Sequence, residues 1–460
     1  MKVLLLSLCL FFIFSTNSTA TEWQLEEILD HQGIGSDCDI AIDNAGGLHV
    51  SFEYKHGFLG SSSVQHAFKA NEESAWDLET VGYDNGGYTG YDNEIELDSA
   101  ERPRIVYVYD IDWEYVPYLK HAEFDGSNWQ IVQLTDWTES VEGPVSIAID
   151  DSDFSHLFYG DWYGAGTMNH RWQSETAWQH EVIDTGNCKS VHAGIDVDGD
   201  LHIAYFKYDL GALRYGFHNG TSWNLETVDV DSGIYYNSGF DMAFDADGYP
   251  HLAYRGSDRE LRHAWHNGVA WQIEVINSNA LGYASIAIDS ADGIHICYSV
   301  YTEASNRPLT YSYKGGSGWI SEEIASDVQC WNTAMDIDLA DQPHIIFYNY
   351  SGGITSHAWP SDPTAVSAAD WDGHFQLEAP HPNPSSGSVR LAFELPREAH
   401  TSLELFDIQG RSVRNLSKGI FSKGYHSIEA RGLPSGVYLC RLKTGGRTLS
   451  RKLVVLPTSK

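Results

Sequence analysis

The sequence predicts an all-β protein, a seven-bladed β-propeller closed by an N-terminal strand and followed by a small C-terminal β-sandwich. Three observations predict it: a repeat of 44 to 55 residues anchored on aspartate, four short strand patterns in each repeat, and a spare fourth-strand pattern ahead of the first repeat. Short strands that recur at this period are typical of propeller blades, with one four-stranded sheet per repeat. No segment sustains a 3.6-residue apolar period long enough to favour a helix.

Each repeat is marked by an aspartate that is followed six residues later by the start of a strand pattern. The seven aspartates are Asp43, Asp98, Asp150, Asp196, Asp245, Asp289 and Asp338. The sixth residue after the aspartate is a histidine in six repeats and Arg104 in the second. These histidines are His49, His156, His202, His251, His295 and His344.

The fifth repeat shows why the unit is a blade. Residues 242–244 lead into a turn around Gly248, and residues 251–254 form a second strand pattern. Residues 261–265 and 271–276 give the third and fourth patterns, with an Asn-Gly turn between them. Short apolar runs bounded by Asp-Gly and Asn-Gly turns indicate hairpins, so the four strands form a meander.

Ring closure is predicted from the tryptophans. A tryptophan followed five residues later by Ile, Val or Leu marks the fourth strand of six repeats. These are Trp76, Trp129, Trp178, Trp223, Trp271 and Trp319. The same pattern begins at Trp23, whereas the seventh repeat breaks into prolines after its third strand at 354–359. Residues 23–29 are therefore predicted to pair as the outer strand of the seventh blade, which removes the open edges of the sheet.

The chain divides into four predicted parts: a signal peptide at 1–20, the propeller at 21–360, a linker at 361–376 and the sandwich at 377–460. The first part carries a lysine, an apolar run over 3–14 and a small-residue end, a pattern typical of a cleaved secretory signal rather than a membrane span. No other stretch is apolar over a membrane-spanning length. We expect an exported protein, secreted or held at the cell surface.

Charge is distributed unevenly. The propeller with its linker carries 14 basic and 57 acidic residues, a net −43, and residues 371–460 carry a net +6. An acidic surface repels nucleic acid, and anionic polysaccharides too unless a cation or a local basic patch intervenes. A solvated coat suited to solubility explains most of this charge without any ligand.

Five cysteines follow the signal peptide: Cys38, Cys188, Cys297, Cys330 and Cys440. The odd number leaves at least one unpaired within the chain. Cys38 and Cys330 precede the first strands of blades that closure makes neighbours, so a disulfide between them is left open. No spacing of cysteine and histidine suggests zinc, and no metal or cofactor site is predicted.

The C-terminal part contains five strand patterns, at 389–395, 402–407, 425–430, 436–443 and 448–456, separated by glycine and proline turns. Four motifs stand among them: HPNP at 381–384, LFDIQGR at 405–411, GLPSGVY at 432–438 and RKLVV at 451–455. In this order and spacing they resemble the type A C-terminal sorting domain of type IX secretion, over residues 377–457. The resemblance implies that the type IX secretion machinery is a partner and that this domain is a transport address, often removed after export. Similar sandwiches also occur as appendages without a sorting role, such as the immunoglobulin-like part of flagellar hook-capping proteins.

The propeller more loosely resembles secreted bacterial propellers with D-x-x-G-x-x-H-I-x-Y repeats, which include lectin-like members. The Asp boxes of sialidases are absent, and the few arginines offer no evident triad for a sialic carboxylate. The resemblance therefore does not extend to a sialidase.

Repeated residues are interpreted as structural. A catalytic centre occurs once, whereas the histidine of the repeat occurs six times, as a hydrogen-bonded blade residue would. Residues 196–199 and 245–248 could each hold calcium, but an Asp-Gly turn between strands explains both. The glutamates three residues after the tryptophans are interpreted in the same way. They are Glu26, Glu79, Glu181, Glu226, Glu274 and Glu322.

Function is predicted where the repeats differ. If the Asp-Gly turns lie on one face, the loops after the second and fourth strands lie on the other, the variable face. The residues predicted to bind ligand are Trp113, Tyr115, Asp161, Trp162, Tyr163, Tyr208, Asp241, Arg255 and Tyr301. Seven unrepeated residues stand four before the anchors, as residues of a channel mouth would: Asp39, Glu94, Ser146, His192, Asp241, Ser285 and Ala334.

Aromatic faces beside carboxylates suit sugar stacking, and exposed Trp and Tyr also mark protein interfaces. The sequence therefore favours a non-enzymatic binding propeller whose ligand is carbohydrate or another extracellular polymer, with a protein ligand as the other possibility. The alternative is a polysaccharide lyase or hydrolase. In that case His192 with Tyr208 or Tyr163 would be the acid and base candidates.

Overall fold

The computed structural model describes sixteen stretches of the chain. They are residues 22–28, 37–56, 61–72, 74–83, 87–111, 117–161, 166–230, 239–302, 306–315, 318–361, 376–385, 388–395, 399–406, 412–422, 424–444 and 447–456. Within them the chain forms 35 strands and one short 3-10 helix, η1 (Tyr208–Leu210). None of these residues form a helix that is long and apolar enough to cross a membrane.

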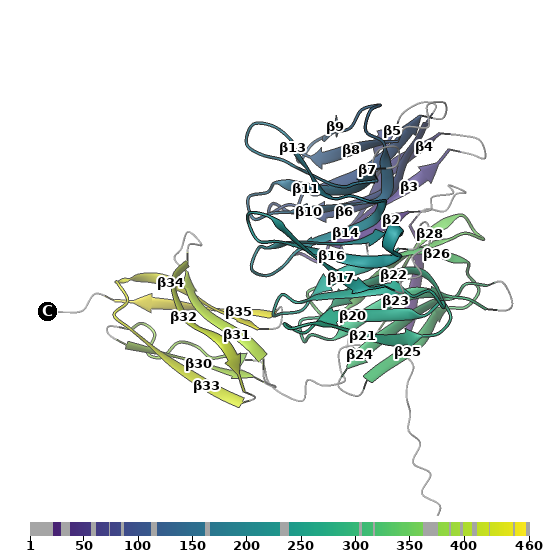
Figure 1. Ribbon diagram of the computed structural model, residues 1–460. Helices are drawn as coiled ribbons and strands as arrows, with labels where there is room; N and C mark the ends of the chain where they lie inside the picture. Colours follow the sequence, from purple (N-terminus) through teal and green to yellow (C-terminus); the bar gives the residue numbers. More distant parts are fainter. Residues whose placement is uncertain are drawn as a thin grey trace, which may run out of the picture.

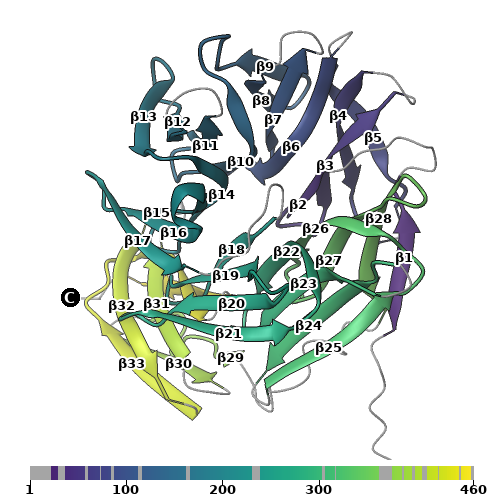
Figure 2. The same cartoon turned by 45° about the vertical axis from the view of Figure 1, so that its right-hand side comes forward.

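Seven four-stranded antiparallel sheets are arranged around a common centre, with the first strand of each blade nearest to it (Figures 1 and 2). Blade 1 is β2 (Cys38–Ile42), β3 (Leu48–Lys55), β4 (Ser62–Lys69) and β5 (Asp77–Tyr83). Blade 2 is β6 (Gly87–Leu97), β7 (Pro103–Ile111), β8 (Tyr118–Phe124) and β9 (Trp129–Gln133). Blade 3 is β10 (Val141–Ile149), β11 (Ser155–Asp161), β12 (Met168–Trp172) and β13 (Gln179–Asp184).

The remaining blades follow in chain order. Blade 4 is β14 (Cys188–Ile195), β15 (Leu201–Lys207), β16 (Ala212–His218) and β17 (Trp223–Asp229). Blade 5 is β18 (Asp241–Phe244), β19 (Pro250–Arg255), β20 (Leu261–His266) and β21 (Trp271–Asn277). Blade 6 is β22 (Ala280–Ile288), β23 (Ile294–Val300), β24 (Leu309–Gly315) and β25 (Gly318–Ala325). Blade 7 is β26 (Cys330–Ile337), β27 (Pro343–Asn349), β28 (Ile354–Pro360) and, from the N-terminus, β1 (Trp23–Glu27).

The N-terminal strand closes the ring as predicted. β1 pairs antiparallel with β28, with Trp23 opposite Pro360 and Glu27 opposite Ser356. The indole Nε1 of Trp23 also donates to Glu322 Oε1 in blade 6, at 2.9 Å. The first and last strands of the propeller therefore share one blade, and the edge of β28 is covered.

The propeller core lies between neighbouring blades. One cluster joins Ala204 and Phe206 of blade 4 to Leu252 and Tyr254 of blade 5. Another joins Val50 of blade 1 to blade 7. Because each blade buries its apolar faces against its neighbours, the seven sheets stabilise one another around the ring.

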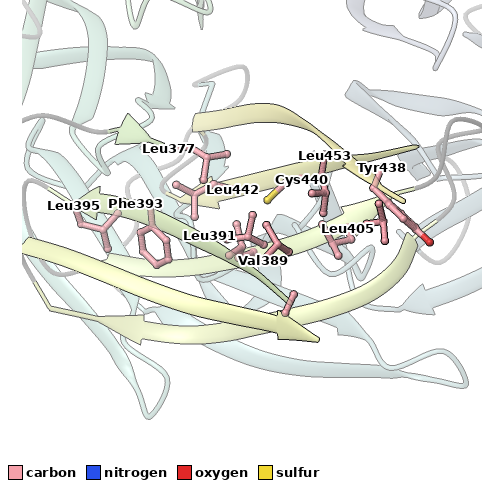
Figure 3. Packing of buried hydrophobic residues seen from close by; sticks show 13 residues of the cluster. Leu377, Val389, Leu391, Phe393, Leu395, Leu405, Tyr438, Cys440, Leu442 and Leu453 are labelled. Atoms are coloured by element: carbon pink, nitrogen blue, oxygen red, sulfur yellow. The ribbon is translucent and has the colours of Figure 1, made fainter. Parts of the chain in front are cut away.

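The C-terminal region forms a two-sheet sandwich. One sheet has the order β29 (Gln376–Leu377), β30 (Ser388–Leu395) and β33 (Gly424–Arg431). The other has the order β32 (Ser412–Phe421), β31 (Ala399–Phe406), β34 (Gly436–Thr444) and β35 (Arg447–Val455). Leu391 and Phe393 of the first sheet pack against Leu442 and Leu453 of the second (Figure 3). Strand β32 is not among the sequence-predicted strands, because it contributes only partly buried residues, Leu416 and Phe421, to this core.

The disulfide that the sequence left open between Cys38 and Cys330 is not formed. Both cysteines are free and buried, as are the other cysteines of the described chain. Cys38 packs in the cluster between blades 7 and 1, and Cys330 packs with Cys297 in the cluster between blades 6 and 7. Their thiols therefore serve as small apolar groups in two different clusters.

Candidate functional site

The anchor aspartates close the turns between first and second strands. Asp43 Oδ1 accepts the N–H groups of Ala45 at 2.8 Å and Gly47 at 2.7 Å, and the other six blades repeat both bonds. A Cβ on Gly47 would lie 2.5 Å from Asp43 Oδ2, which explains the glycine. Among the described residues no group of three or more His, Cys, Asp or Glu is arranged to hold a metal ion. The recurrence of these turn bonds in every blade gives the Asp-Gly segments a structural role in the turns.

The repeated histidines belong to a relay that crosses each blade. In blade 5, Asp245 Oδ2 lies 3.5 Å from His251 Nε2, and His251 Nδ1 lies 3.0 Å from His263 Nε2. His263 Nδ1 then bonds Glu274 Oε1 at 3.0 Å. Blades 1, 3 and 7 repeat this order, and a tyrosine replaces the second histidine in blades 4 and 6. The histidines and the glutamates of the repeat are thus hydrogen-bonded blade residues, as the sequence predicted.

In blade 2, Arg104 replaces the histidine and also contacts the anchor aspartate. Its guanidinium lies 3.3 Å from Asp98 Oδ2 and donates to Asp153 O at 2.7 Å and to Ser155 Oγ at 3.0 Å. Burial, and then the charge of Arg104, lowers the pKa of His121 to about 3. The exception in the repeat is therefore also structural.

Six of the seven unrepeated positions, all but Ser146, line the central channel, and most of the seven also join neighbouring blades. The side chain at this position accepts the N–H of the residue that follows the same position in the next blade. The pairs are Asp39 with Ile95, Glu94 with Ile147, Ser146 with Ala193, Asp241 with Ile286 and Ser285 with Met335. Between blades 7 and 1, where Ala334 has no acceptor, Asp336 Oδ2 accepts the N–H of Ile42 at 2.9 Å. These hydrogen bonds between neighbouring blades recur around the ring, and their acceptors are carboxylate or hydroxyl oxygens.

His192, which holds this position in blade 4, contacts blade 5 through a side-chain bond and does not accept an N–H from any described residue. Its Nε2 lies 2.8 Å from Asp241 Oδ1, and Ser285 Oγ donates to Asp241 Oδ2 at 2.6 Å. Burial opposes the charge on His192, but the attraction of Asp241 and Glu94 prevails and raises its pKa to about 10. The imidazole is therefore protonated at neutral pH, which is the wrong state for a general base.

Three carboxyl groups of the channel have pKa values above the usual range. Burial in the channel wall raises the pKa of Asp39 to about 7, of Glu94 to about 8 and of Asp336 to about 6. Asp241 goes the other way: burial opposes its charge, yet His192 holds its pKa below the usual value. Near neutral pH the channel therefore holds a charged pair beside carboxyl groups that are partly protonated.

A small cavity of about 120 Å³ opens the channel toward the variable face. Its rim includes Asp92, Ser190 and Tyr283, which have positive φ angles of 48°, 44° and 53°. Such angles are uncommon for residues other than glycine, and most of all for a bulky residue such as Tyr283. Asp37 Oδ2 accepts the N–H of Asp92 at 3.1 Å, and Asp37 Oδ1 accepts from Asn332 Nδ2 at 3.1 Å. Sequence reasoning missed this rim, although all five residues stand two positions before one of the seven unrepeated positions.

The predicted ligand residues are only partly within the described chain. Trp113, Tyr115, Trp162 and Tyr163 lie outside it. Asp161 ends β11, Arg255 ends β19 and Asp241 lines the channel. Tyr208 and Tyr301 lie on the variable face after second strands, with 54% and 47% of their surface exposed. Tyr350 holds the same place in blade 7, is 55% exposed, and was missed by the sequence analysis.

Of the proposed acid and base residues, the structure describes His192 and Tyr208 and does not bring them together, and Tyr163 lies outside the described residues. His192 pairs with Ala204 in the middle of β15, whereas Tyr208 begins η1 beyond the end of that strand. Lys189 Nζ lies 5.7 Å from the ring centre of Tyr208. The alternative of a lyase or hydrolase therefore gains no geometric support from His192 and Tyr208.

Comparison with known proteins agrees with the two parts of the chain. Residues 380–456 match the family described as secretion system C-terminal sorting domain, so this sandwich is a sorting domain of the type IX kind, which indicates secretion. No curated protein matches the sequence. The propeller is similar in fold to a lectin from Burkholderia pseudomallei, with 13% identity, a TM-score of 0.49, and coverage of 77% of this chain and 98% of the lectin. A Hadza microbial sialidase is also similar, with 12% identity, a TM-score of 0.47, and coverage of 73% of this chain and 68% of the sialidase. The Aleuria aurantia lectin has 12% identity and a TM-score of 0.44, with coverage of 64% of this chain and 96% of the lectin.

Proposed function

We propose that this chain is an exported propeller that binds carbohydrate on its variable face, without catalysis. The observation that carries the proposal is the recurrence of a half-exposed tyrosine after the second strand in blades 4, 6 and 7. A tyrosine ring offers an apolar face for a sugar ring and a hydroxyl for its polar groups. Three such rings on one face of a rigid scaffold suit a polymer of repeated units.

Two features of the fold support this placement. The repeated Asp, His and Glu side chains are used within the blades, and the channel residues are used between them. The variable face presents the half-exposed rings of Tyr208, Tyr301 and Tyr350. Left-handed backbone occurs at its channel mouth, where it includes the bulky Tyr283, and also in Asp turns of the opposite face. Strained backbone of this kind is a recurrent feature of ligand sites. A protein ligand is the other occupant that exposed tyrosines would suit.

The proposal is tested by a glycan array on the exported protein, with a reducing-end assay on the same glycans. We expect binding without turnover. Tyr301→Ala and Tyr208→Ala should each weaken the affinity by roughly 1–3 kcal/mol, and so should Trp113→Ala and Trp162→Ala at the predicted positions. Titration calorimetry measures these changes, and Leu339→Ala, an exposed residue of an Asp turn, is the matched control. New reducing ends would show an enzyme, and full binding in all four aromatic variants would place the site elsewhere.

A further inference from the structure

The junction between blades 5 and 6 carries an arginine on an exposed tyrosine. Arg259, in the loop after the second strand of blade 5, accepts the N–H of Ala280 on its carbonyl at 2.8 Å. Tyr301 of blade 6 donates its N–H to Asn279 O at 2.8 Å. These two bonds place the guanidinium 5.0 Å above the ring centre of Tyr301. Both side chains are exposed on the variable face.

The next junction, between blades 6 and 7, repeats this arrangement. Arg307 O accepts the N–H of Cys330 at 3.0 Å, and Tyr350 donates its N–H to Gln329 O at 2.9 Å. Here the guanidinium lies 3.8 Å from the ring centre of Trp331, which is 5.6 Å from the ring of Tyr350. The same backbone frame therefore presents an arginine and aromatic rings at two successive junctions.

A third junction of the same frame lacks the arginine. Between blades 3 and 4, Gly166 O accepts the N–H of Cys188 at 2.9 Å, and Tyr208 donates to Asn187 O at 2.9 Å. Gly166 has a φ of 63°, and Arg259 has a φ of 65° at the corresponding position. Glycine adopts this conformation freely, whereas an arginine there is strained. An arginine kept where the backbone favours glycine indicates that its side chain has a use.

Neither arginine has an anionic partner within the part of the chain that the structure describes. Among the described residues, at least eight of the 14 basic residues of the propeller lie within 4.0 Å of a carboxylate oxygen: Lys55, Lys69, Arg102, Arg104, Arg171, Lys207, Arg262 and Lys314. Among the described residues no ion pair involves Arg259 or Arg307. The propeller and its linker carry 57 acidic residues, so a cation without an ion pair among the described residues is available to an anion from outside.

We propose that Arg259 with Tyr301, and Arg307 with Trp331 and Tyr350, are two equivalent sites that bind the anionic groups of an acidic polysaccharide. The inference rests on the proposed function and names its ligand class. A guanidinium holds a carboxylate or a sulfate through parallel hydrogen bonds, and the adjacent ring stacks on the apolar face of the same sugar. The two sites form the local basic patch that an anionic polymer needs against the net negative charge of the propeller. Two sites one blade apart on a single chain bind a polymer with avidity.

The test uses the exported protein with three polymers of similar length: polygalacturonate, dextran sulfate and neutral dextran. We expect polygalacturonate or dextran sulfate to bind more tightly than dextran, and the tighter of the two identifies the anion. Arg259→Ala and Arg307→Ala should each weaken that binding roughly ten- to a hundredfold, the range of a charge-assisted hydrogen bond. The double variant should lose more than either single one because avidity is lost. Arg102→Ala, which removes the same charge from an Asp turn on the opposite face, should bind as the wild type does.

Arg259→Gly separates binding from structure. Glycine suits the φ of 65°, so this variant should melt at or above the wild-type temperature and still lose binding. A lower melting temperature with unchanged binding would show that Arg259 is structural and would overturn the inference. Dextran binding that depends on Tyr301 while neither acidic polymer binds would also overturn it and leave the proposed function standing. If none of the polymers binds, and no glycan on the array does either, both proposals fail.

Discussion

His263 provides a test of the blade relay, because it is fully buried between two partners. It bonds His251 and Glu274 and stacks on Trp265, with ring centres 5.0 Å apart. Burial lowers its pKa from 6.5 to about 4. The unfolded chain therefore binds this proton more readily than the folded one. The contribution to stability is complete above about pH 6.5 and is lost as the pH falls toward 4.

The size of this effect follows from the shift. Between about pH 7.5 and pH 5, a group with these two pKa values costs the folded state about 2 kcal/mol, because one pKa unit corresponds to 1.36 kcal/mol. We predict that His263→Gln lowers the free energy of unfolding by roughly 1–3 kcal/mol at about pH 7.5, where it leaves Glu274 and His251 without a partner. At about pH 5 the difference from wild type should shrink by about 2 kcal/mol, since the variant has no proton to take up at this position.

Urea unfolding followed by tryptophan fluorescence measures both values, because all 15 tryptophans except Trp371 lie in residues 21–360. The control is Leu252→Ala, which removes a fully buried, non-titrating side chain from the same blade. It should cost 2–5 kcal/mol at both pH values. If the His263→Gln and wild-type stabilities fall in parallel between the two pH values, the relay histidine does not carry the pH dependence and the argument fails.

Three further predictions concern the chain as a whole. Deletion of residues 21–30 should lower the thermal midpoint of the propeller, because β28 loses its partner β1; an unchanged midpoint would contradict ring closure. Removal of residues 371–460 should leave that midpoint unchanged but stop export, as immunoblots of cells and medium would show, and normal levels of truncated protein in the medium would count against the sorting role. Thiol labelling without a reductant should modify Cys38 and Cys330 only after denaturation; their failure to react in denaturant would restore the disulfide.

The fold could be predicted because its determinants are local in sequence. In the first turn, Asp43 accepts the N–H groups of Ala45 and Gly47, which lie at most four residues away. The aspartate therefore recurs in the sequence wherever the turn recurs in the structure. The pattern that begins at Trp23 predicted the closing strand, because it matches the fourth-strand pattern of six repeats. Strand β32 was missed because it buries few apolar residues, and its polar letters give no alternating pattern.

The site was predicted only in part, because its contacts join different blades. Tyr301 could be found from its place after a second strand, but the contact with Arg259 spans two blades and leaves no local pattern. Trp331 was missed for the same reason, because its contact with Arg307 joins blades 6 and 7. Tyr350 follows a second strand as Tyr301 does, so its local position could have identified it. A comparison of the repeats for positions where a glycine in one blade is replaced by a charged residue in another would have pointed to Arg259 and Gly166.

The channel residues show how variation between repeats can mislead. Asp39, Glu94 and Ser285 differ in type, which suggested a ligand site, yet each accepts an N–H from the next blade. Any side chain with an oxygen that reaches this N–H can accept the bond. The residue type at this position can therefore vary while its structural role stays the same. Variation therefore locates function only where the charged or polar group of the side chain has no ion pair or hydrogen bond inside the fold. Arg259 and Arg307 meet that condition among the described residues, and for this reason we propose that the ligand binds at the blade junctions of the variable face rather than in the channel.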